Sequence, residues 1–160
     1  MQRIVPCLWF DNGDAEEAAK FYVTLLPNSH VDKLFRAPAD WPSGSAGSVL
    51  TVEFTLDGNK YVGLNGGPEV PFTDAVSFQI LCETQTEVDR LWSTLIKNGG
   101  KEVQCGWLKD RWGLSWQIVP TRLMELMNDP NGARAKRAME SMMQMVKIDI
   151  AQLEKAVGTK

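Results

Sequence analysis

The chain has 160 residues, of which 44% are hydrophobic and 23% are charged, and its formal net charge is −3. This length suits one well-filled domain over residues 1–160, and the composition is typical of a globular protein and not of a disordered or membrane-spanning one. The negative charge excludes the dense basic surface that nucleic-acid binding requires. We therefore expect neither nucleic acid nor a membrane as a partner.

The first half of the chain predicts one strand, one helix and three further strands. The loop over residues 11–13 ends the first strand, and Asp14 is placed to cap a helix that Pro27 stops. Asp57-Gly58 is a strong hairpin signal between the last two strands. The strands are expected at residues 4–10, 31–35, 49–56 and 60–65, and the helix at residues 14–26.

The second half predicts the same order of elements. Thr84 and Glu87 form a capping box at the start of its helix, which ends at Asn98-Gly99-Gly100. Tyr22 and Trp92, which are 70 positions apart, occupy equivalent places on the two helical stripes. A repeat of this length indicates a duplicated βαβββ unit, although any two amphipathic helices would share some likeness. The strands are expected at residues 75–82, 101–104, 107–109 and 114–119.

After Pro120 the pattern is helical, with a break at residues 128–132. Apolar residues then recur at spacings of three and four and form a narrow seam: Ala135, Met139, Met142, Val146, Ile150, Leu153 and Val157. Such a seam docks on the protein's own sheet or on a partner subunit, and we favour this over a hydrophobic ligand site built from methionines. The seam predicts a homodimer.

Cysteine and histidine are scarce. The three cysteines, Cys7, Cys82 and Cys105, are widely spaced, which fits neither a disulfide framework nor a paired-cysteine zinc site. Unpaired cysteines suit a reducing compartment, so we expect a cytoplasmic protein. The one histidine, His30, lies at a helix-to-strand junction and is expected on the surface. Mechanisms that need two imidazoles are excluded.

Together these elements predict an α+β fold. Two βαβββ repeats, at about residues 3–68 and 74–120, would form a curved, partly open mixed β-sheet cleft, with C-terminal helices at about residues 121–157. Because side chains alternate across a strand, one face of each strand packs on helices and the other lines the cleft.

The side chains expected to line the cleft are mostly small, amide-bearing or aromatic. The candidate ligand-binding residues are Cys7, Trp9, Thr51, Asn65, Ser77, Gln79, Trp107, Ser115 and Gln117, and Glu53 is the only carboxylate among them. A concave face with a few convergent polar groups predicts a small-molecule ligand. The alternative is a solvated surface of half-buried strands.

Three motifs carry a resemblance to a known family. They are Pro-Cys-Leu-Trp-Phe at residues 6–10, Leu-Asn-Gly-Gly-Pro at 64–68, and the longer run at 104–117 that begins Gln-Cys-Gly-Trp. They resemble the PhnB-like branch of the vicinal-oxygen-chelate superfamily, which includes glyoxalase I and bleomycin resistance proteins. That branch is often labelled "3-demethylubiquinone-9 3-methyltransferase". The resemblance runs from Ile4 to about Val157.

The resemblance also implies where a metal would sit in metal-dependent relatives, whose ligands lie on the first and last strands of each half. Those positions fall here on Cys7, Ser77 and Gln117, with a fourth between Val62 and Asn65. A serine and an amide are poor ligands for a transition ion, which prefers imidazole, carboxylate or thiolate. We therefore expect no metal and no cofactor.

Three functions are compatible with these features. The leading one is a metal-free small-molecule-binding protein. The second is a metal-independent lyase or isomerase with Glu53 as general base, or a methyltransferase as the family label says. No glycine-rich strand-to-helix turn of the Rossmann type supports the label. The third is a dimeric assembly module that uses the seam.

Overall fold

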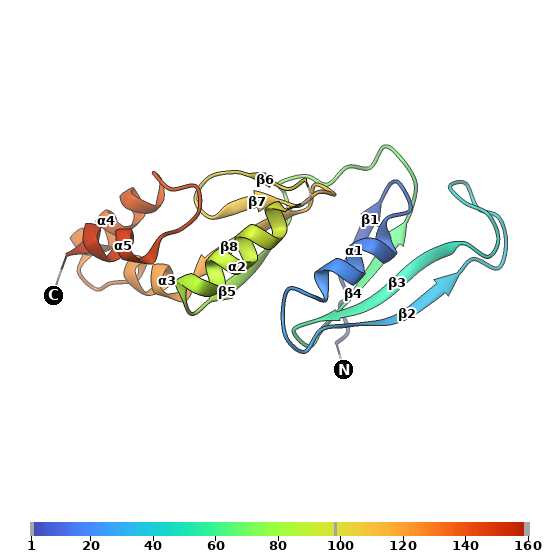
Figure 1. The fold of residues 1–160 in the computed structure, drawn as a ribbon, viewed down its shortest axis with the longest axis horizontal. Helices are drawn as coiled ribbons and strands as arrows, with labels where there is room; N and C mark the ends of the chain where they lie inside the picture. The colour runs from blue at the N-terminus through green and yellow to red at the C-terminus, as the bar shows by residue number, and fades with distance from the viewer. Residues whose placement is uncertain (1, 98, 159–160) are drawn as a thin grey trace. The chain divides into compact units, whose positions relative to one another are not determined.

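A computed structural model describes residues 2–97 and 99–158 (Figure 1). The chain divides between Phe72 and Thr73 into two compact units. This division falls in the short segment between the two expected repeats. None of the helices in the described ranges is long and apolar enough to cross a membrane.

The first unit has the predicted order of one strand, one helix and three strands. Its strands form a four-stranded mixed sheet in the order β1-β4-β3-β2, in which β1 runs parallel to β4 and the other pairs are antiparallel. The buried side chains of Leu8, Phe10, Val52 and Phe54 face the helix and form the core. The elements are β1 (Cys7–Phe10), α1 (Ala15–Tyr22), β2 (His30–Arg36), β3 (Val49–Leu56) and β4 (Asn59–Asn65).

Two boundaries of the first unit differ from the prediction. The first strand begins at Cys7 and not at residue 4, since Ile4 is 84% exposed and pairs with no strand. The helix ends at Tyr22, because the N–H groups of Thr24 and Leu25 bond to carbonyls three residues back and tighten the chain into turns. The hairpin at Asp57-Gly58 is confirmed, with positive φ at both residues, as a tight hairpin turn requires.

The second unit repeats this arrangement, and the predicted duplication is confirmed. Its sheet order is β5-β8-β7-β6, again with the first and last strands parallel. The Thr84 side chain caps the helix by accepting the Glu87 N–H at 3.2 Å, as predicted. Asn98, at the predicted helix end, lies outside the described residues. The elements are β5 (Ser77–Cys82), α2 (Gln85–Ile96), β6 (Lys101–Glu102), β7 (Trp107–Lys109) and β8 (Ser115–Pro120).

Three helices follow in the same unit and form what we call the C-terminal extension: α3 (Thr121–Met127), α4 (Gly132–Met142) and α5 (Ile150–Val157). The predicted seam does not run along one helix. The chain turns between Met142 and Ile150, where the Asp149 side chain caps a new helix by accepting the Gln152 N–H.

The seam is therefore folded back on itself. Leu153 and Val157 are buried in a core shared with Val119 and Leu123, whereas Met139 remains 47% exposed. Leu153 and Val157 stabilise the unit from within and Met142 packs partly against them, whereas Val146, like Met139, is largely exposed at 40%. The homodimer stays a prediction, without the continuous surface on which it was based.

Candidate functional site

The face of the second sheet turned away from α2 carries a connected row of polar side chains. Strand register places Gln79 beside Gln117, and Gln117 beside Trp107. The Gln79 Nε2 donates to Gln117 Oε1 at 3.3 Å, and the Gln117 Nε2 donates to Ser77 Oγ at 2.8 Å. The predicted face assignment of Ser77, Gln79 and Gln117 is confirmed, and these three residues lie in one hydrogen-bonded chain.

A second row lies directly beside the first. Ser77 pairs with Ser115, and Ser115 pairs with Lys109. The Ser115 hydroxyl donates to Asp74 Oδ1 at 2.9 Å, and Lys109 Nζ lies 2.8 Å from the same oxygen. These hydrogen bonds, first from Lys109 and then from Ser115, lower the pKa of Asp74. Sequence reasoning missed Asp74 and Lys109, because a loop aspartate and a strand lysine carry no motif until the strands pair.

The corresponding face of the first sheet is different in character. Cross-strand register aligns Cys7, Val62 and Glu53 in one row. Glu53 is exposed and lies opposite Lys33 on β2. An exposed carboxylate beside a lysine is typical of a solvated surface pair, and this position gives Glu53 no support as a general base.

Trp9 is predicted to form an aromatic wall, and its indole is held by the backbone of its own unit. Register places it beside Leu64, which pairs in turn with Thr51. The Trp9 Nε1 donates to the Gly67 carbonyl at 2.7 Å, and a Cβ at Gly66 would overlap the indole ring. This packing gives a structural reason for the Gly-Gly pair in the motif at residues 64–68.

Asn65 does not lie on the open face, and its predicted face assignment is wrong. Its Oδ1 accepts the Ala15 N–H at 2.9 Å, and its Nδ2 donates to the Val49 carbonyl at 2.9 Å. Asn65 is only 7% exposed. Its side chain caps α1 in place of Asp14, which was expected to cap this helix but makes no side-chain hydrogen bond to it. The face was misassigned because Gly63, and not Val62, faces the helix: a Cβ there would lie 3.2 Å from that of Ala15.

A further polar cluster, also missed from the sequence, lies where β2, β3 and β4 meet at one end. Asp32 accepts hydrogen bonds from Thr55 at 2.8 Å and from Lys60 at 2.7 Å, and His30 Nε2 lies 3.2 Å from it. Burial acts to raise the pKa of Asp32, but the bonds from Lys60 and Thr55 outweigh it and lower the pKa overall. This cluster ties three strands together through buried Thr55.

The side chains at the inferred metal positions do not fit a transition ion. Ser77 and Gln117 bond to each other. In the second unit Ser77 pairs with Ser115, and in the first unit Cys7 pairs with Val62. Two residues further along the last strand, Gln117 of the second unit therefore corresponds to Leu64 of the first. Burial raises the pKa of the Cys7 thiol, which keeps it protonated at neutral pH. Within residues 2–97 and 99–158, no three His, Cys, Asp or Glu side chains gather as a metal site would require.

The strand-to-helix turns also differ from a nucleotide-type cofactor site. The turn from β1 to α1 spans residues 11–14 and has one glycine, Gly13, while the turn from β5 to α2 spans residues 83–84 and has none. Dinucleotide- and adenosine-binding turns of the Rossmann type use several glycines to bring the backbone close to the cofactor. Neither turn fits that pattern.

Comparison with known proteins agrees with the topology. The sequence profile of the 3-demethylubiquinone-9 3-methyltransferase family matches residues 2–119. A PhnB protein from Bacillus cereus is 30% identical, with a TM-score of 0.66, over 74% of this chain and 99% of that one. A protein from Pseudomonas aeruginosa shares the fold at 18% identity, with a TM-score of 0.59, over 75% of this chain and 98% of that one.

A glyoxalase/bleomycin resistance protein from Albidiferax ferrireducens is 15% identical, with a TM-score of 0.43, over 69% of this chain and 92% of that one. No curated protein matches the chain. The profile match and the Bacillus cereus relative confirm the resemblance drawn from the three motifs, but the profile ends at residue 119 and not near Val157 as expected. The chain belongs to the 3-demethylubiquinone-9 3-methyltransferase family, in its PhnB-like branch.

Proposed function

We propose that this protein binds a small molecule without a metal ion, and that the ligand lies on the open face of the second sheet. The observation that carries the proposal is the 2.8 Å hydrogen bond between Gln117 and Ser77. These residues stand at two positions that the family resemblance assigns to metal ligands. Here the two side chains bond to each other and offer amide and hydroxyl groups in place of imidazole and carboxylate.

The hydrogen-bond donors of the polar row, formed by Ser77, Gln79, Gln117 and Trp107, favour a ligand with oxygen acceptors. A carboxamide has two N–H donors, and the bonds from Gln79 and Gln117 along the row use one donor each. The Ser77 hydroxyl accepts from Gln117, and its proton is available for another group. Trp107 adds a flat apolar surface beside Gln117. A polar or aromatic compound with carbonyl or carboxylate oxygens matches this set of groups.

The enzyme alternatives receive less support. Glu53 is exposed beside Lys33, and the two strand-to-helix turns lack the glycines of an adenosine cofactor site. The family description names a methyltransferase, but the residues of this chain do not fit the cofactor that such a reaction uses. Binding by the polar row requires none of these features.

Ligand-observed NMR with a panel of aromatic and aliphatic carboxylates and carbonyl compounds tests the proposal. We expect Gln117→Ala to weaken binding by about tenfold or more, because a buried acceptor on the ligand would lose its donor. Gln152→Ala, on the exposed surface of α5, is the matched control and should bind as the unmodified protein does. Equal binding by the two variants would refute the role of the row.

The absence of a resident metal is tested separately. Elemental analysis of protein purified without an affinity column should find well under one metal ion per chain. The double variant Ser77→His, Gln117→Glu should acquire weak nickel binding in calorimetry, because it supplies an imidazole and a carboxylate on adjacent strands. Stoichiometric metal in the unmodified protein would contradict the proposal, and so would failure of the double variant to bind nickel.

A further inference from the structure

The C-terminal extension lies beyond the part of the chain that the family shares. The family profile ends at residue 119, one residue before β8 ends. The Bacillus cereus protein uses 99% of its length to match 74% of this chain, which is about the share of the chain that precedes α3. These helices therefore follow the part of the chain that the family profile matches, and they contact the second βαβββ unit directly.

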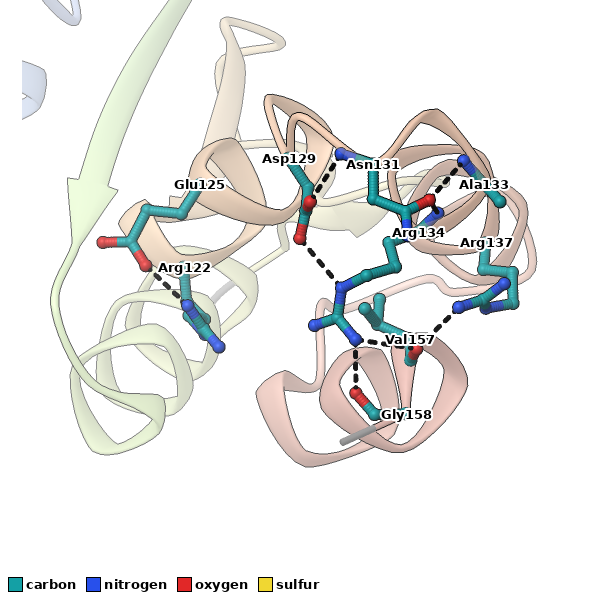
Figure 2. Close-up of polar contacts among 9 residues, drawn as sticks. All are labelled: Arg122, Glu125, Asp129, Asn131, Ala133, Arg134, Arg137, Val157 and Gly158. Carbon is teal, nitrogen blue, oxygen red and sulfur yellow. Dashed lines mark hydrogen bonds and ion pairs between the residues drawn. The ribbon is translucent and has the colours of Figure 1, made fainter. Parts of the chain in front are cut away.

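Polar contacts join the helices of the extension to one another (Figure 2). The guanidinium of Arg134, on α4, lies 2.9 Å from Asp129 and donates to the Gly158 carbonyl at 2.8 Å, at the end of α5. Arg137 donates to the Val157 carbonyl at 2.9 Å. The Arg134 and Asp129 side chains are only 13% and 17% exposed, so the ion pair is well shielded from water. Together with the apolar core, these bonds hold the three helices as one body.

The segment between α4 and α5 docks on the turn that precedes β7. The N–H groups of Cys105 and Gly106 donate to the carbonyls of Met145 and Val146, each at 2.8 Å. Gly106 has a φ of +83°, and a Cβ there would lie 3.0 Å from the Ile148 side chain. The extension therefore fixes both the hydrogen bonds and the packing of this turn.

The same segment is also bound to the first turn of α2. The Gln85 Nε2 donates to the Ile148 carbonyl at 3.1 Å, and the Gln85 Oε1 accepts the Ile150 N–H at 2.9 Å. Lys147 forms an ion pair with Asp89. One amide side chain thus holds two backbone groups of the extension against the helix.

The extension reaches the polar row of Ser77, Gln79, Trp107 and Gln117 at two places. Trp107 directly follows the clamped Gly106. Val119 lies two residues beyond Gln117 on the same side of β8, and it is 5% exposed because it belongs to the core of the extension. The extension thus covers the sheet face next to Gln117 and holds the backbone next to Trp107.

We infer that the C-terminal extension positions Trp107 and bounds the ligand face beside Gln117, so that it is a working part of the binding site. The inference rests on the proposed function only in treating Trp107 and Gln117 as binding residues. It means that this chain selects its ligand with a wall built from residues that lie beyond the family profile. Gln85 is then a positioning residue, since it acts on Trp107 through the docked segment.

Fluorine NMR of the full chain labelled with 5-fluorotryptophan tests this without any ligand. The protein has six tryptophans, and Trp107→Phe assigns the resonance of interest. Gln85→Ala removes both bonds to the extension, and Lys147→Ala loosens the docking more mildly. We expect both variants to shift the Trp107 resonance by more than its linewidth. Amide exchange at Cys105 and Gly106 should accelerate about tenfold or more in Gln85→Ala.

Matched readouts separate positioning from general destabilisation. Gln152→Ala, on the same extension, should leave Trp107 unchanged. The resonances of Trp92 and Trp116, in the core of the second unit, should stay in place, whereas a merely structural role would move them as well. An unmoved Trp107 resonance in the Gln85→Ala, Lys147→Ala double variant would overturn the inference. If Gln85→Ala does not fold, Lys147→Ala alone decides. Because no ligand is used, this outcome is independent of the binding experiments.

Discussion

The two βαβββ units share their order of elements and their strand pairing, but their open faces have different chemistry. The first carries charged groups such as Lys33 and Glu53, and its Trp9 indole is bonded to the backbone. The second carries amides and hydroxyls joined side to side in a row, with the Lys109–Asp74 ion pair beside it. The helix-facing side chains set the packing of each unit, and the opposite face is free of that constraint. One frame therefore carries a structural face in one copy and, in the other, the face that we propose binds the ligand.

The units also differ in how their last strand ends. In the first unit β4 runs into Gly66, which leaves room for the Trp9 indole, and Gly67, whose carbonyl accepts the indole N–H. In the second unit β8 runs straight into α3, and Val119 becomes part of a new core. The first strand end stabilises its own unit, whereas the second serves as the attachment point of an additional element.

The largest loss of stability is expected from a substitution in the core of the C-terminal extension, which only the second unit has. Leu153 is fully buried there, and Leu153→Ala should cost about 3–5 kcal/mol of unfolding free energy through lost burial and a cavity. Leu81→Ala, at a position 54% exposed in the same unit, should cost less than about 1 kcal/mol. Urea unfolding of both variants gives the comparison, and similar costs would mean that the extension's core contributes little.

The second prediction contrasts one amide from each unit. Asn65→Ala should cost about 2–3 kcal/mol, because the Ala15 N–H and the Val49 carbonyl are both left without their partner. Gln117→Ala should cost only about 0.5–1.5 kcal/mol, since its partners Ser77 and Gln79 retain access to water. Thermal unfolding compares the two variants directly. Equal losses would remove the distinction between a structural face and a binding face.

Two glycines sharpen the comparison of the strand ends. Gly66→Ala should destabilise the protein by about 1–3 kcal/mol, because the added methyl group would overlap the Trp9 ring. Gly132→Ala, where nothing lies within 4 Å of a Cβ, should instead stabilise the protein by about 0.4–1 kcal/mol. Chemical unfolding of each variant measures the sign. A neutral Gly66→Ala would show that Trp9 moves aside without cost.

The smallest effect concerns acid stability in the first unit. The pKa of Asp32 is lowered from 3.8, so its contribution to stability is present above that value. The contribution is lost as the pH falls through the lowered value, because protonation breaks the bonds from Lys60 and Thr55. Carboxyl NMR titration should place the Asp32 pKa below 3.8, and Lys60→Ala should raise it. A titration unaffected by Lys60→Ala would show that the lysine is not the cause.

Structural features that depend on residues close together in the sequence were predictable from the sequence. The Thr84 cap, the Asp57-Gly58 hairpin and the repeat of elements all rest on contacts within a few positions, or on a periodicity that folding must respect. The alternation on β5 and β8 also sufficed, because Phe78, Trp116 and Ile118 leave no doubt about which side is apolar. Ser77, Gln79 and Gln117 were found for that reason.

The tertiary structure decided two questions that the spacing of apolar residues leaves open: which face of a strand packs on the helix, and how many helices an apolar repeat forms. On β4 the apolar Val62 and Leu64 suggested the helix face, but close packing of α1 requires Gly63 there and turns Asn65 inward. The apolar repeat from Ala135 to Val157 fits one long helix as well as two short ones, and the Asp149 cap selects two. The Asp74 and Asp32 clusters, and the docking of Gln85 on the extension, join residues far apart in the sequence. These ion pairs and hydrogen bonds depend on distances that are set only when the chain folds. No pattern of neighbouring residues in the sequence predicts them.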